Sequence, residues 1–164
     1  NMDPEFLKCP RKWDSSSIGK FMIWMGPVSS IFDIITYVIL YFVICPAVCG
    51  GSFGAPGVNS TLFMALFHAG WFVESLWSQT LVIHMIRTPK VPFIQSRASL
   101  PVLVITTIAI IVGTIIPYTP LGAGLDMAAL PAIYFAWLAG IIFAYMVLIT
   151  VVKKIFVKKY GDLL

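Results

Sequence analysis

Long uninterrupted runs of apolar residues dominate the chain. Four of them occupy residues 18–44, 61–86, 98–116 and 132–152, and polar or Gly- and Pro-rich stretches separate them. A helix needs about 20 apolar residues to cross the hydrocarbon core of a bilayer. Because the runs are continuous rather than alternating, they predict helices and not a barrel. The pattern predicts an all-α polytopic membrane protein, a bundle of four transmembrane helices.

The segments between the runs predict where the helices begin and end. Asn59 can cap the second helix, Pro101 suits the first turn of the third, and Pro131 suits the first turn of the fourth. Residues 45–60 and 117–131 are rich in Gly and Pro, which predicts irregular loops.

The first run carries a local interruption. Pro27 follows Gly26 and cannot donate to the carbonyl of Ile23, so a kink is expected there. Ser29 and Ser30 could satisfy the carbonyls that the kink frees.

Composition strengthens the membrane interpretation. The chain has 164 residues, of which 59% are hydrophobic and 11% charged, with a mean hydropathy of +0.93. A soluble domain would need more polar residues to cover its surface. The first run is also longer than the apolar core of a signal peptide, so we do not expect cleavage.

The basic residues predict the orientation. All eleven lie before or at the start of the first run, between the second and third, or after the fourth, and the loops 45–60 and 117–131 contain none. By the positive-inside rule, both termini and the middle loop are cytoplasmic. Residues 1–17 then form a cytoplasmic juxtamembrane linker, and residues 18–164 form the membrane domain with its basic tail. The net charge of +4 fits anionic membrane lipids and requires no nucleic-acid partner.

Two carboxylates are the strongest candidates for chemistry. Asp33 lies near the middle of the first run and Glu74 near the middle of the second, at similar depth in antiparallel helices. A charge near the bilayer centre costs roughly 2.5–3.5 kcal/mol on insertion scales. We therefore expect both side chains to face the bundle, either as an ion or proton site or as hydrogen-bonded structural acids.

A helical wheel of the second run predicts one polar stripe. It contains His68, Glu74, Ser75, Ser78 and Gln79. Carboxylate and carbonyl oxygens are ligands that Mg²⁺ prefers. Within this stripe, Glu74 is the better candidate to influence a cation.

Asp33 is expected to have a different role, because it follows the Gly26-Pro27 pair. There it would accept hydrogen bonds that fix the irregular backbone.

The cysteines and histidines suggest no further site. Cys45 and Cys49 could form a disulfide or bind a soft metal, but two free thiols are favoured, and Cys9 should stay reduced in the cytoplasm. His84 is expected at the membrane interface, and its separation from His68 does not fit zinc ligands. The sequence also lacks a phosphate-binding glycine loop, a zinc-protease motif and a Ser-His-Asp arrangement, so this segment alone is not expected to be an enzyme.

Three stretches carry a family resemblance: KFMIWMGPVSSIFDI, FHAGWFVESLWSQTLVIHMIRTPKVPFIQSRASLPVL and PYTPLG. They resemble the C-terminal membrane portion of bacterial magnesium-transporting P-type ATPases, and DPEFLKCPRKWD is similar to the cytoplasmic loop before it. The resemblance implies that the four spans are helices seven to ten of a ten-helix pump in the bacterial plasma membrane.

The resemblance also implies ATP-driven Mg²⁺ import through an aspartyl-phosphate, with Mg²⁺ as the transported ion and as the partner of ATP. The phosphorylated Asp of the D-K-T-G-T motif is absent from this chain, so no catalytic residue carries over. The implied partners are the upstream helices and cytoplasmic domains, which these helices would support. Glu74 and Gln79, and then Asp33, are the candidates to reach the edge of the cation path.

Two other interpretations remain open on the sequence. The chain could be a free-standing four-span scaffold that binds a partner and transports nothing, or a small channel formed by oligomerisation. An upstream reading frame that encodes D-K-T-G-T would decide for the pump.

Overall fold

The computed structural model describes residues 15–87, 95 and 98–161, and these residues contain helices and no strand. The helical elements follow in the order α2 (Ser15–Ile39), π-helix η1 (Leu40–Ile44), α3 (Cys45–Cys49), α4 (Ser60–Ile86), α5 (Leu100–Ile115), 3₁₀-helix η2 (Ile116–Tyr118), α6 (Pro120–Gly124) and α7 (Ala132–Tyr160).

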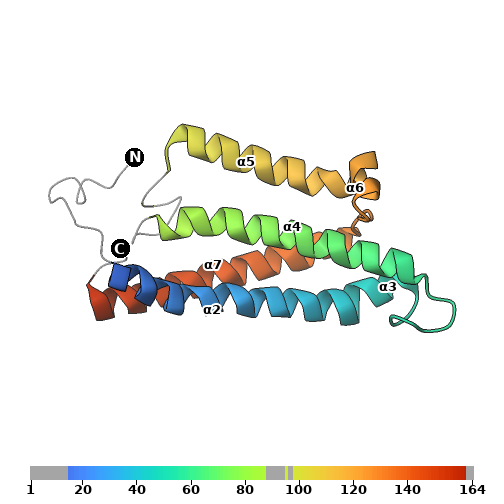
Figure 1. Ribbon diagram of the computed structural model, residues 1–164, viewed down its shortest axis with the longest axis horizontal. Helices are drawn as coiled ribbons and strands as arrows, with labels where there is room; N and C mark the ends of the chain where they lie inside the picture. The colour runs from blue at the N-terminus through green and yellow to red at the C-terminus, as the bar shows by residue number, and fades with distance from the viewer. Residues whose placement is uncertain (1–14, 88–94, 96–97, 162–164) are drawn as a thin grey trace.

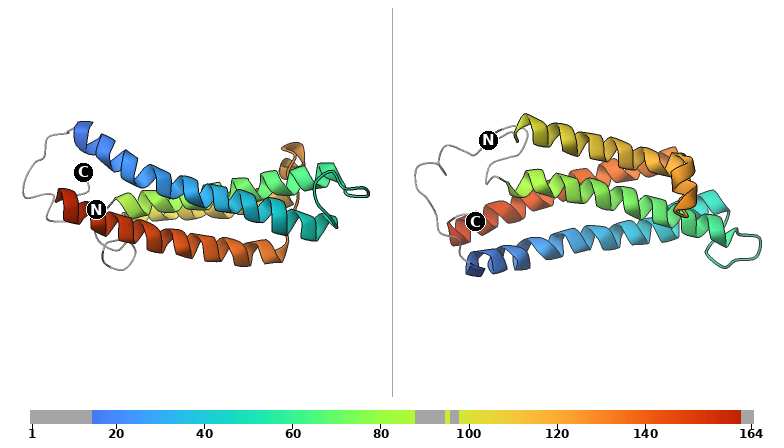
Figure 2. Two further views of the ribbon diagram at one scale, coloured as in Figure 1. Left: turned by 90° about the horizontal axis from the view of Figure 1, so that it is seen from below. Right: turned by 45° about the horizontal axis from the view of Figure 1, so that its top comes forward.

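Three long helices form the centre of the molecule. Helices α2, α4 and α7 each pack against the other two, whereas α5 packs on α4 at the side (Figure 1). Successive long helices run antiparallel, and α2, η1 and α3 continue one another as a single rod (Figure 2).

The apolar core lies between α2, α4 and α7. Its fully buried side chains include Leu40, Val73, Tyr145 and Ile149. The large apolar side chains that remain exposed lie mostly on the outward faces of the long helices, and α5 is the least buried of the apolar helices. Outward apolar faces are what a helix presents to lipid or to further membrane helices.

The predicted kink at Pro27 does not interrupt the first helix. Helix α2 continues through Pro27 without a break. The Ser30 hydroxyl donates to the Gly26 carbonyl at 3.4 Å, as expected for a carbonyl near a proline. Ser29, however, does not serve the local backbone, because its hydroxyl lies 2.9 Å from the Tyr145 hydroxyl on α7.

Two loop boundaries differ from the prediction. Residues 45–49 are helical as α3, and the helix ends at Gly50, which has a φ of 78° that favours glycine. Pro46 lies in the first turn of α3, where a proline is tolerated, so the Pro signal did not mark a loop there. The loop 117–131 likewise contains η2 and α6.

The fourth helix is longer than the apolar run that predicted it. Helix α7 extends to Tyr160, beyond residue 152, and ends at Gly161 with a φ of 87°. The lysines from 153 onward do not stop it, since Phe156 on the same turns is buried against Phe21 and Trp24 of α2.

The helix starts are close to their predictions. The Asn59 side chain accepts a hydrogen bond from the Leu62 N–H at 3.1 Å, which confirms it as the cap of α4. Pro101 lies in the first turn of α5. Pro131 lies one position earlier than expected, as the extended residue that precedes α7.

Three helices are long and apolar enough to cross a membrane, in the ranges 18–49, 100–118 and 132–160. Helix α4 is as long, with 27 residues, but is not among them. Its serines, histidines, glutamine and glutamate lower its mean hydropathy. The all-helical membrane fold is therefore supported, while the count of four spans stays a prediction.

The described basic residues gather at one end of the bundle. The start of α2, the end of α4, the start of α5 and the end of α7 all lie at that end (Figure 1). It carries Lys20, Arg87 and the lysines 153–159. Most of the predicted linker, the middle loop from 88 to 97 except Gln95, and Cys9 lie outside the described residues.

Candidate functional site

Glu74 is the most deeply buried acidic side chain among the described residues. It lies in the middle of α4 with 0% of its surface exposed. Neither of its carboxyl oxygens makes a hydrogen bond within the described part of the chain. A buried carboxyl group without hydrogen bonds is expensive, so a residue in this state is a candidate for binding a cation or a proton.

Asp33 of α2 is the neighbour of Glu74. The two carboxyl groups lie close enough to interact electrostatically across the α2–α4 contact. Asp33 is only partly buried, so the pair has one fully enclosed member and one more accessible member. The structure thus brings together the two acids that the sequence placed at similar depth.

Hydroxyl groups surround the Asp33–Glu74 pair. The Tyr134 hydroxyl of α7 donates to the Gly70 carbonyl at 2.6 Å, one helical turn before Glu74. The Tyr145 hydroxyl bonds with Ser29 and is also close to both acids. The Thr36 hydroxyl, one turn after Asp33, is buried and unpartnered. The result is a polar centre inside an otherwise apolar bundle.

The predicted polar stripe of α4 divides into two faces. Glu74 and Ser78 are buried, whereas His68 and Gln79 are exposed. The Gln79 side-chain amide donates to the Ser75 hydroxyl at 3.0 Å and lies on the outer surface. Five residues of an α-helix correspond to well over one turn, which rotates Gln79 away from Glu74. The structure therefore does not bring Gln79 to the carboxyl pair.

The expected role of Asp33 beside the Gly26-Pro27 pair stays a prediction. Its described interaction is with Glu74 on another helix, and the Ser30 hydroxyl donates to the Gly26 carbonyl beside Pro27.

Two buried polar residues were not predicted. Lys153 is 1% exposed, and its ammonium donates to the Met85 carbonyl in the last turn of α4 at 3.1 Å. His84 is 5% exposed and hydrogen-bonds with Thr106 of α5 at 3.0 Å, while its predicted position at the membrane interface stays a prediction. The sequence signal for Lys153 was its position, first in the basic tail and still in phase with the apolar residues of α7.

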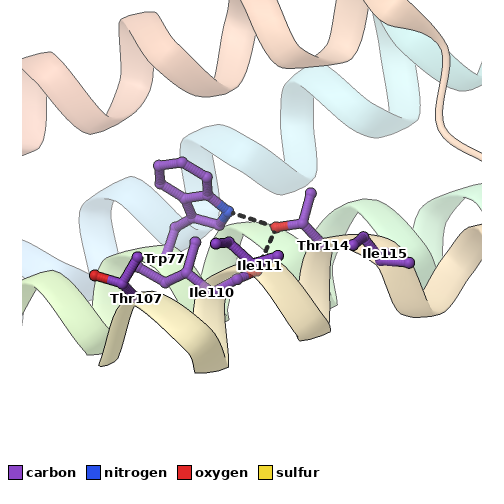
Figure 3. A pocket seen from close by; sticks show the side chains of 6 residues that line it. All are labelled: Trp77, Thr107, Ile110, Ile111, Thr114 and Ile115. Atoms are coloured by element: carbon purple, nitrogen blue, oxygen red, sulfur yellow. Dashed lines mark hydrogen bonds between the residues drawn. The ribbon is translucent and has the colours of Figure 1, made fainter. Parts of the chain in front are cut away.

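A groove lies elsewhere, between α4 and α5 (Figure 3). It has a volume of about 440 Å³, and its lining residues are Trp77, Thr107, Ile110, Ile111, Thr114 and Ile115. The Trp77 indole N–H donates to the Thr114 hydroxyl at 3.0 Å, which in turn donates to the Ile110 carbonyl. These lining residues carry no ionisable group.

A closed metal site does not exist within the described residues. They contain no group of three or more His, Cys, Asp or Glu side chains that could hold a metal ion. Cys45 and Cys49 are free thiols, as expected. Any cation at the carboxyl pair would therefore need further oxygen ligands, such as backbone carbonyls, water or groups from other helices.

Comparison with known proteins identifies the family of this chain. Residues 2–155 match the family described as cation transporting ATPase, C-terminus. The chain belongs to that family. This finding confirms the family resemblance seen in the sequence, and the match covers α2, α4, α5 and α7 as far as residue 155.

The relatives are magnesium-transporting ATPases by name. The segment is 47% identical to a "Magnesium-transporting ATPase, P-type 1" of Salmonella typhimurium LT2 and 43% identical to one of Escherichia coli K12. Each match covers 161 residues, or 98% of this chain. It covers only 16% and 17% of the two relatives, so the segment spans about a sixth of their length.

Proposed function

We propose that this chain is the C-terminal membrane support domain of an ATP-driven Mg²⁺ importer, a P-type ATPase of a bacterial plasma membrane. Its four long helices would be transmembrane helices seven to ten, with α4 as the eighth. Family membership and the names of the relatives support this proposal. Both termini and the middle loop would be cytoplasmic, because the basic residues gather at one end of the bundle.

The observation that carries the transport role is the Asp33–Glu74 pair. A support domain without contact to an ion would gain stability from apolar residues at these positions, because uncompensated buried acids are destabilising. Here the two acids face each other between α2 and α4, with free oxygens on Glu74. Hard cations favour such oxygens, so the pair would act at the edge of the Mg²⁺ path.

The remaining functions belong to other parts of the parent protein. ATP binding and the aspartyl-phosphate intermediate would reside in cytoplasmic domains upstream of this segment. Gln79, on the outer face of α4, would contact upstream membrane helices rather than the carboxyl pair. Gln79 would then reach the edge of the cation path through its contact with those upstream helices. Anionic lipids are expected around the basic end.

The test uses the full-length protein that carries this segment, purified and assayed for Mg²⁺-dependent ATP hydrolysis. Glu74→Gln is expected to raise the Mg²⁺ concentration for half-maximal activity, and Asp33→Asn is expected to do so less. Asp126→Asn is the matched control, because Asp126 is an exposed acid in the turn after α6. Unchanged Mg²⁺ activation in both Glu74→Gln and Asp33→Asn would refute the role of the pair.

A further inference from the structure

One turn of α4 is held by residues of two neighbouring elements. In an α-helix, the carbonyl of residue 70 is the normal acceptor for the N–H of residue 74. The Tyr134 hydroxyl, which comes from α7, donates to the Gly70 carbonyl at 2.6 Å. Tyr134 itself is 2% exposed. Its hydroxyl therefore contacts the start of the turn that carries the Glu74 carboxyl group.

The same turn also packs against the π-helix. Leu40, the first residue of η1, is fully buried and lies against Gly70. A Cβ atom on Gly70 would come within 2.5 Å of a Leu40 methyl group, so a larger residue at this position would displace the Leu40 side chain. A π-helical turn shifts the side chains that follow it, and such turns occur frequently at functional sites.

These contacts fix where Glu74 points. Tyr134 holds the backbone from α7, and Leu40 holds it from the α2–η1 rod. The Glu74 carboxyl group makes no hydrogen bond of its own within the described residues, so its direction depends on the backbone beneath it.

We propose that Tyr134 is a positioning residue, whose hydroxyl aims Glu74 at Asp33 by holding the 70–74 turn of α4. Tyr134 does not contact the cation. It acts through the backbone, and it keeps the two carboxyl groups at the separation at which they act together. This proposal rests on the proposed role of the pair in Mg²⁺ binding.

The test compares single-hydroxyl deletions in the full-length protein. Tyr134→Phe keeps the buried ring and removes the hydroxyl alone. It is expected to raise the half-maximal Mg²⁺ concentration about threefold to tenfold, the effect of losing one hydrogen bond, with the maximal rate of ATP hydrolysis unchanged.

The matched control is Tyr118→Phe. The Tyr118 hydroxyl also donates to a backbone carbonyl, that of Leu130 at 2.8 Å, but it does not contact α4. This variant is expected to keep the wild-type Mg²⁺ dependence. A purely structural role for Tyr134 would lower the thermal stability without shifting the Mg²⁺ dependence, and that result would overturn the proposal.

Two further measurements keep the proposal testable. If Tyr134→Phe does not fold, Leu40→Ala relaxes the same turn through its contact with Gly70 and is expected to shift the Mg²⁺ dependence in the same direction. An unshifted Leu40→Ala then counts against the proposal. The Glu74→Gln variant distinguishes a failure of the positioning proposal from a failure of the proposed function. If Glu74→Gln shifts the Mg²⁺ dependence and Tyr134→Phe does not, the carboxyl pair is functional and Tyr134 does not position it.

Discussion

At the scale of single residues, buried polar groups decide how the three central helices meet. Glu74 and Lys153 are both almost completely buried, but their hydrogen bonding differs. The Lys153 ammonium is a donor and lies at a carbonyl of the last turn of α4, where the helix dipole favours a positive charge. The Glu74 carboxyl group has no comparable partner. The lysine is therefore a structural cation, and the glutamate is the residue to which we assign a function as a proposal.

A pair of lysine variants tests this assignment. Lys153→Met keeps the apolar stem and removes the charge, so the Met85 carbonyl loses a charge-assisted hydrogen bond worth about 1.5–3 kcal/mol. The melting temperature of the full-length protein in detergent is expected to fall. Lys154→Met, at an exposed neighbouring position, is expected to leave it unchanged. Equal melting temperatures for the two variants would show that the contact with Met85 is not stabilising.

At the scale of elements, the last turns of α7 attach the start of α2 to the bundle. Phe156 packs edge-to-face on Phe21 with ring centroids 6.0 Å apart, and Trp24 lies 6.3 Å from the same ring. Lys159 lies over the Trp24 ring, with its ammonium 5.2 Å from the centroid. Aromatic and cationic groups of this kind suit the membrane–water interface. These turns are part of the domain and not a detached basic tail.

The contribution of these turns can be measured with two neighbouring substitutions. Phe156→Ala removes a buried ring and is expected to destabilise the helix end by about 3–5 kcal/mol. Ile155→Ala, on the exposed face of the same turn, should cost far less. Limited proteolysis of membranes that contain each variant would report the difference, with faster cleavage near residue 160 expected for Phe156→Ala only. Equal cleavage would indicate that α2 does not hold the end of α7.

At the scale of the whole molecule, the described basic residues and the turn-rich loops lie at opposite ends of the bundle (Figure 1). The start of α2 and the end of α7 share the basic end (Figure 1). Cys45 is buried and Cys49 is half-buried, so neither native thiol beside the first loop is a good reporter of orientation. Exposed positions in the loop after α3 and near the end of α7 serve better.

Labelling from outside the cell tests the orientation. In a variant of the full-length protein without native cysteines, Ser52→Cys is expected to react with an impermeant thiol reagent in intact cells. Lys158→Cys is expected to react only after permeabilisation, because its end of the bundle is predicted to be cytoplasmic. Both positions are exposed, so burial does not limit either reaction. Labelling of Lys158→Cys in intact cells would reverse the proposed topology.

Local sequence determined where the helices form and most of the positions at which they begin. Each apolar run became a helix, Asn59 caps α4, and Pro101 begins α5, because capping and proline geometry depend on a few consecutive residues. The sequence also identified Asp33 and Glu74, since a carboxylate in an apolar run is conspicuous. It failed at residues 45–49 and 153–160, where Pro, Gly and Lys signals suggested an end that the helices do not have.

Only the tertiary structure decided which polar groups meet. The contact between Asp33 and Glu74, the Tyr134 hydroxyl at Gly70 and the Lys153 ammonium at Met85 each join different helices. A helical wheel gives the face of one helix but not the rotation of that helix against its neighbours. For this reason it grouped Gln79 with Glu74, whereas packing turned Glu74 inward and left Gln79 at the surface. The rotation follows from how side chains of three helices fill a common core, which no single segment of the sequence contains.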